Sequence, residues 1–208
     1  MILYRCVVSA ALLVAFISGS GCGGGNKEPS KLEQLQQTAK AMEETAKQME
    51  KAQSGEQKPV PPVSFKVLLT FLPKSVGDLK PGEPEGETQS MGEWNFSNAS
   101  IAFTGEGGKQ ANVELFDYAH IGILYAPYTI LLNMKFSRES TKGYEKSTKL
   151  GDFPAFEKWE NADGRNEMTV LVADRFIVTV KTDKLGEGSA RKIAEGMDLK
   201  KLSMQTAS

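Results

Sequence analysis

The chain has very few of the residues that metal sites and nucleophilic catalysis need. Its 208 residues include one His and two Cys. A single imidazole cannot build a His-rich zinc site, and it leaves only one candidate for a Ser–His or Cys–His pair. The chain also lacks an excess of one charge, since 25 basic residues face 26 acidic ones. That balance argues against a nucleic-acid-binding protein with a basic surface stripe, and against an acidic disordered tail.

No apolar run reaches the roughly 20 residues that a helix needs to span a bilayer. At the N-terminus, Arg5 precedes an apolar run from Cys6 to Ile17, and small residues follow at 18–21. These are the three parts of a secretory signal peptide. A buried helix of a cytosolic protein is the alternative, which the glycine-rich break after the run disfavours. We therefore predict that residues 1–21 are a signal peptide that is removed.

The small-residue zone ends in Gly19-Ser20-Gly21-Cys22, which resembles the lipobox of bacterial lipoproteins. Gly19 departs from the Leu that is usual there. The resemblance covers residues 1–25 and implies cleavage between Gly21 and Cys22, with acyl chains on the Cys22 sulfur holding the protein to a membrane. Cys22 is then the only Cys left, so no intramolecular disulfide is expected. Gly23 stands where an inner-membrane lipoprotein usually has Asp. The family rule therefore favours the outer membrane, facing the periplasm, in a Gram-negative cell envelope.

A spacer is expected between the anchor and the domain. Residues 22–29 read as a lipidated, Gly-rich tether, and residues 30–53 as a helix that opens with the capping-box spacing of Ser30 and Glu33. Apolar residues recur in this helix at spacings of three and four, at Leu32, Leu35, Ala39, Met42, Ala46 and Met49. The seam fits a solvated stalk, or a short coiled coil that would form a weak homodimer. A Pro-rich linker at 54–63 follows, then a globular domain at 64–203 and a polar tail at 204–208.

The globular part is predicted to be α+β, with an antiparallel sheet of about six strands and helices on one face. A short helix at 64–72, capped by Ser64, and a loop at 76–88 come first. A hairpin turn at 105–109 joins the first two strands. The strands are expected at about 91–103, 110–118, 143–149, 153–160, 168–172 and 176–181. A closing helix is expected from its N-cap Ser189 to about Met197.

The stretch Ala119–Asn133 is the most apolar part of the chain after the signal peptide. It predicts a buried helix that packs across the sheet and bends or restarts at Pro127. The alternative is that part of it lines an apolar groove for a lipid, a peptide or a partner helix. The candidate groove residues are Ile123, Leu124, Tyr125, Tyr128, Leu131 and Leu132.

The sequence shows no catalytic constellation. His120 lies three residues after Asp117, but no G-x-S-x-G elbow supplies a nucleophile. The Gly-rich turn at 105–109 lacks phosphate-loop spacing. Acidic residues fall at turns or strand ends, and Glu157 and Glu160 are expected on an outer strand face. We predict no catalytic residue, no metal site and no cofactor.

These observations predict a non-enzymatic envelope lipoprotein whose small domain binds a protein or another envelope component. A second class is a carrier or sensor of an apolar ligand, with the segment 121–132 as a cavity wall. A third is a hydrolase that uses paired carboxylates. An enclosed apolar pocket would favour the carrier, and two carboxylates converging in a cleft would favour the hydrolase.

Overall fold

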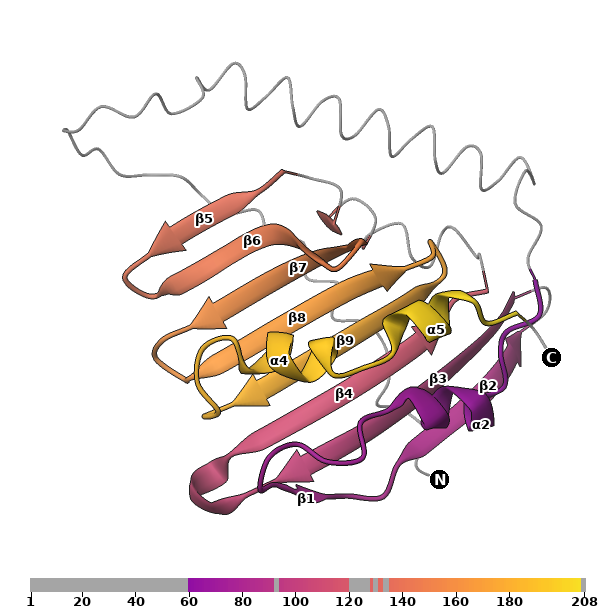
Figure 1. Cartoon of the computed structure of the whole chain (residues 1–208), viewed down its shortest axis with the longest axis horizontal. Helices are drawn as coiled ribbons and strands as arrows, with labels where there is room; N and C mark the ends of the chain where they lie inside the picture. Colours follow the sequence, from indigo (N-terminus) through magenta and orange to yellow (C-terminus); the bar gives the residue numbers. More distant parts are fainter. Residues whose placement is uncertain (1–59, 92–93, 120–127, 129–130, 133–134, 207–208) are drawn as a thin grey trace, which may run out of the picture.

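The computed structural model describes residues 60–91, 94–119, 128, 131–132 and 135–206. Within these residues the chain forms an open antiparallel sheet of nine strands (Figure 1). The strand order is β1-β3-β4-β9-β8-β7-β6-β5, and β2 also pairs with β3. The strands span Lys80–Pro81 (β1), Glu85–Met91 (β2), Trp94–Thr104 (β3), Gln110–Asp117 (β4), Ser137–Ser140 (β5), Gly143–Leu150 (β6), Phe153–Glu160 (β7), Arg165–Val172 (β8) and Phe176–Asp183 (β9).

The predicted antiparallel sheet is confirmed, but the domain is richer in β-structure than the sequence suggested. Strands β1 and β2 lie partly within the segment 76–88 that was predicted to be a loop, and β5 was not predicted. All three lie at the edges of the sheet and are polar and almost entirely exposed. Exposed edge strands need no apolar alternation, and charged or polar side chains there discourage pairing with other chains.

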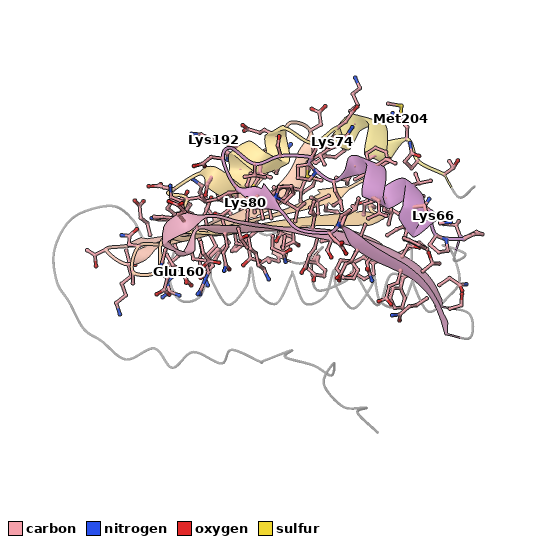
Figure 2. All side chains as sticks on the ribbon, turned by 90° about the horizontal axis from the view of Figure 1, so that it is seen from below. Lys66, Lys74, Lys80, Glu160, Lys192 and Met204 are labelled. Carbon is pink, nitrogen blue, oxygen red and sulfur yellow. The ribbon has the colours of Figure 1, made fainter. Side chains whose placement is uncertain are left out.

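The helices among the described residues are short. Those with complete bounds are α2 (Phe65–Leu68), α4 (Ser189–Glu195) and α5 (Leu199–Ser203). One 3-10 turn, Leu69–Phe71, follows α2, and another spans Glu106–Gly108; Tyr128, Leu131 and Leu132 are also helical. Because these helices span only four to seven residues, the domain is β-rich rather than clearly α+β. Figure 2 shows the three helices on the same side of the sheet, which we call the helix face.

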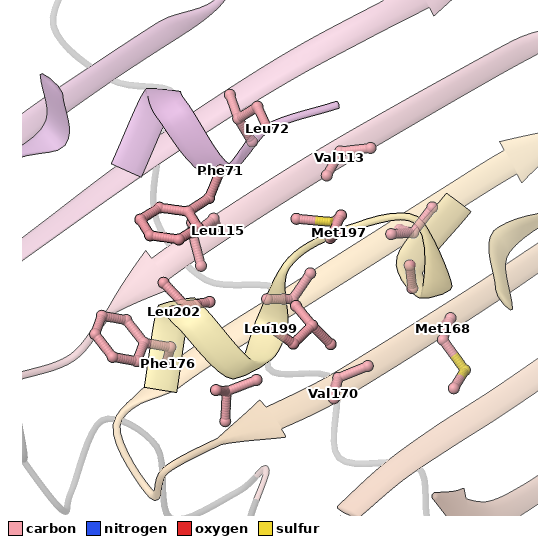
Figure 3. Close-up of a cluster of buried hydrophobic side chains, with 14 of the residues drawn as sticks. Phe71, Leu72, Val113, Leu115, Met168, Val170, Phe176, Met197, Leu199 and Leu202 are labelled. Carbon is pink, nitrogen blue, oxygen red and sulfur yellow. The ribbon is translucent and has the colours of Figure 1, made fainter. Parts of the chain in front are cut away.

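Alternate residues of the central strands build the core beneath these helices. In β4, Ala111, Val113 and Leu115 are buried, while the residues between them are half-buried. The register sets Leu115 beside Val178 of β9. The helices and the 3-10 turn cover this surface with Leu68, Phe71, Ala190, Ala194, Leu199 and Leu202, as the close-up in Figure 3 shows for several of them.

One of the two predicted helix caps is wrong. Ser64 is the N-cap residue of α2, as predicted, but its side chain makes no capping hydrogen bond. The N-cap of α4 is Gly188, whose φ of 73° lies in the left-handed region that favours glycine. The Ser189 hydroxyl instead lies 2.6 Å from the carbonyl oxygen of Gly186. The short helix α5, which was not predicted, is capped by the carboxylate of Asp198, which accepts a hydrogen bond from the Lys201 backbone N–H.

A buried ion pair holds the start of the described chain to the sheet. Asp117 lies on the helix face, as Leu115 does, and it is fully buried. Arg175 donates to both of its carboxylate oxygens, at 2.8 and 2.7 Å. The backbone N–H groups of Val63 and Ala119 donate to the same carboxylate, and Arg175 also donates to the Pro61 carbonyl. We call this set of contacts the terminal clamp.

The second face of the sheet carries two different surfaces. At one end, the helical residue Leu132 packs on Leu171 and Ile177. At the other end, neighbouring strands set charges of alternating sign side by side, at Glu145, Lys158, Glu167 and Lys181. Lys158 lies 2.7 Å from Glu160, and this hydrogen bond is the main reason that the pKa of Glu160 is lowered. On this surface Lys158 and Arg165 are therefore each neutralised by neighbouring carboxylates.

Candidate functional site

A groove of about 490 Å³ lies on the helix face between the loop 73–77 and α4. The loop forms one wall, and the length of α4 from Ser189 to Gly196 forms the other. Two kinds of side chain line the groove. The apolar ones belong to Val76, Leu185 and Ile193, and the basic ones to Lys74 and Lys192. Figure 2 shows the two lysines on this side of the sheet.

The loop wall is shaped by a tight turn between two buried leucines. Leu72 and Leu79 are both buried, so the segment between them must turn over the surface of the core. The Leu79 N–H donates to the Val76 carbonyl at 3.0 Å and closes the turn. Gly77 makes it with φ of +52°, a conformation that other residues adopt at a cost. The two anchors leave Lys74 exposed at the rim, while Val76 is half-buried and packs against the core.

The α4 wall is fixed to the sheet by contacts at its first turn. The side-chain oxygen of the fully buried Asn166 accepts a hydrogen bond from the Ala190 N–H at 2.9 Å. The Ser189 hydroxyl lies 2.6 Å from that of Thr182 in β9. Ala190 and Ala194 have no exposed surface and allow the helix to lie close to the strands. These contacts turn Lys192 and Ile193 toward the groove.

Arg191 supplies the strongest link between α4 and the sheet. Its guanidinium donates to the Glu157 carboxylate through Nε at 3.2 Å and Nη2 at 2.9 Å. It also donates to the Lys149 carbonyl and to the Thr148 hydroxyl. The Tyr144 hydroxyl donates to the other oxygen of Glu157 at 3.1 Å. Burial, and then the nearby carboxylates of Glu157 and Glu187, raise the pKa of Tyr144, so this phenol stays protonated as a donor.

Glu157 corrects a prediction. The sequence placed it with Glu160 on an outer strand face, but only 2% of Glu157 is exposed. Residues three apart in a strand lie on opposite faces, so only Glu160 reaches the second face. Glu157 lies under α4, and both of its oxygens already accept hydrogen bonds. Its role here is to hold the helix that forms a groove wall.

In the part of the chain that the structure describes, the lysines at the groove are not paired with carboxylates as Lys158 and Arg165 are on the second face. Among the described residues, neither Lys74 nor Lys192 lies within ion-pair distance of a carboxylate. Glu195, on the same helix, lies 3.8 Å from Arg191. Both lysines are exposed. The groove therefore offers two ammonium groups to a ligand, above an apolar floor.

The residues predicted as sites fall mostly elsewhere. Gly21, Cys22, the spacer 30–53 and His120 lie outside the described residues, as do Ile123, Leu124 and Tyr125 of the predicted apolar groove. Tyr128, Leu131 and Leu132 are described and helical. Leu132 is 4% exposed and packs in the core of the second face, whereas Leu131 is 37% exposed. An apolar groove at 123–132 stays a prediction.

The groove residues were missed by sequence reasoning, although the closing helix that forms one wall was predicted from Ser189 to about Met197. Nothing in the sequence indicates that the loop 73–77 lies opposite this helix, because that contact joins segments more than 100 residues apart. Loop lysines are too common to be a signal.

The described residues bring together no group of three or more His, Cys, Asp and Glu side chains that could hold a metal ion. No family model matches the chain, and no curated protein or solved structure matches it either. Across the part of the chain that the structure describes, no helix has the length and apolar character needed to cross a membrane.

Proposed function

We propose that this chain is a lipid-anchored, non-enzymatic binding protein of the bacterial cell envelope, and that the groove beside α4 is its binding surface. The observation that supports the binding role most directly is the groove itself, in which an apolar floor lies between two lysines that have no carboxylate partner among the described residues. Ligand sites usually combine an apolar lining with a few polar groups that orient the ligand. Tethering at Cys22 rests on the lipobox resemblance of residues 19–22, and places the domain in the periplasm, on the outer membrane in a Gram-negative cell.

The domain organisation supports the same role. The helices α2, α4 and α5 all contribute side chains to the core on the helix face, which supports treating them as one layer over the sheet. In this arrangement the sheet is the scaffold and the helix layer supplies the recognition surface. The buried carboxylates Asp117 and Glu157 are both held by arginines in the scaffold, so neither supplies a free acid for hydrolysis.

The binding role is tested by photo-crosslinking in the bacterium that makes the protein. A benzophenone amino acid replaces Ile193 in the groove of the full-length chain, and Lys181 on the second face in a control chain. We expect one discrete protein adduct from position 193 under ultraviolet light and none of that size from position 181. If both positions give the same adducts, or if position 193 gives none, the groove is not the binding surface.

A further inference from the structure

The groove has the dimensions of a short extended peptide. Helix α4 and its C-cap line it from Ser189 to Gly196, a length of about 11 Å at the rise of an α-helix. An extended chain covers that length with about three residues. The groove is hollowed between two walls and is open to solvent along its length, so a chain segment fits it better than a flat lipid surface does.

The charge of the helix layer favours an acidic ligand. The segments 61–79 and 184–206 carry seven basic residues and four acidic ones. The two lysines nearest the ligand, Lys74 and Lys192, stand on opposite walls of the groove. On the second face, by contrast, Lys158 and Arg165 are each within 4 Å of at least two carboxylates. Two lysines that no described carboxylate neutralises, on either side of an apolar floor, complement a ligand in which carboxylates alternate with apolar side chains.

We infer that the groove binds an extended segment of a partner protein in which acidic residues alternate with aliphatic ones. In an extended segment, successive side chains point in opposite directions. Aliphatic side chains then enter the groove over Val76 and Ile193, and the acidic side chains reach outward to Lys74 and Lys192 at the two rims. This inference rests on the proposed function, and adds to it the chemistry of the partner.

The test measures peptide binding to the full-length lipidated chain in nanodiscs of zwitterionic phospholipid. The probe is a five-residue peptide of alternating leucine and acidic residues with a rhodamine label, read by fluorescence anisotropy. Its matched control has asparagine and glutamine in place of the aspartate and glutamate. We expect the acidic peptide to bind more tightly, and its affinity to fall as salt is added.

Two double variants separate the groove from general basic charge. Lys74→Gln with Lys192→Gln should weaken binding of the acidic peptide about tenfold, since each lysine makes one exposed charge contact. Lys200→Gln with Lys201→Gln removes the same charge from exposed positions on α5, and should change the affinity less than twofold. All four lysines are exposed, so both variants are expected to fold.

Three results would overturn the inference. Equal binding of the acidic and neutral peptides, or no binding of either, removes the acidic partner. The third is that the two lysine variants lose the same affinity for the acidic peptide and that anionic phospholipid in the nanodisc abolishes peptide binding. These two observations together would show that the basic surface binds membranes instead. A discrete adduct from position 193 would keep the binding role even if the peptide results fail, so the two proposals can be judged apart.

Discussion

Replacing Arg175 by Met should destabilise the domain strongly, because it leaves a carboxylate buried without its counter-ion. Asp117 has no exposed surface and Arg175 has 7% of its side chain exposed. Met keeps much of the aliphatic volume of Arg but removes both hydrogen bonds to Asp117 and the bond to the Pro61 carbonyl. Two backbone N–H groups, from Val63 and Ala119, still solvate the carboxylate.

The expected cost is about 3–5 kcal/mol, the range found when one partner of a buried pair is removed. That is a large part of the roughly 5–15 kcal/mol that stabilises a typical domain. For a domain of this size it corresponds to a fall in Tm of about 10 °C or more. Urea unfolding of the chain, followed by circular dichroism, measures the change in the free energy of unfolding.

Two further variants check the reasoning. Arg165→Met removes an arginine that also contacts several carboxylates but has about half of its side chain exposed, and should change the urea midpoint far less. Adding Asp117→Asn to Arg175→Met removes the buried charge, so the double variant should be less destabilised than the sum of the two single variants. An Arg175→Met chain as stable as Arg165→Met, or strictly additive losses, would show that the terminal clamp does not stabilise the fold through its charges.

Three other outcomes follow from the structure. Burial raises the pKa of Tyr118 above its ordinary value of 10.0, so its contribution to stability is complete below that pH and is lost as the pH rises. Above about pH 10 the melting temperature of Tyr118→Phe should therefore fall less steeply with pH than that of the parent chain. Identical alkaline profiles of the melting temperature would contradict this. Leu132→Ala should cost about 2–5 kcal/mol through lost burial, and the half-exposed Leu131→Ala clearly less, in the same urea assay; equal losses would show that Leu132 is not core. Cys22→Ser should leave the membrane fraction or remain uncleaved, and a variant that matures and fractionates like the parent would refute the lipid anchor.

The central strands could be predicted from the sequence because their apolar residues alternate. β4, β7 and β9 lie within two residues of their predicted ranges, and the hairpin turn at 105–109 is confirmed by the pairing of β3 with β4. The edge strands could not be predicted this way. β2 reads EGETQSM and is held by backbone hydrogen bonds to β3, with almost no buried side chain to mark it.

The buried polar residues could not be predicted either, and Glu157 was placed on the wrong face. Asp117, Glu157 and Asn166 are all buried on the helix face, and each is satisfied by a partner far away in the sequence. The alternation of residues in a strand shows only that these positions are polar, and polar side chains are normally predicted to be exposed to solvent. The partners Arg175 and Arg191 come from segments that the sequence pattern cannot place beside them. The same limit hid the groove, whose two walls meet only in the folded chain.

The terminal clamp and the groove lie at opposite ends of the sheet, and this separation has a consequence for binding. Along the strand direction, the clamp lies at the end of β8 where Val172 pairs with Phe176 of β9. The first turn of α4 is fixed to Asn166, near the other end of β8. Six residues of β8 separate these two positions, or about 20 Å. The chain that leads from the predicted anchor therefore joins the domain far from the groove, and a ligand can bind without disturbing that junction. Arg175→Met should accordingly lower stability while the remaining folded protein binds the acidic peptide with unchanged affinity. A loss of affinity at a temperature where the variant is fully folded would show that the two ends of the sheet are coupled.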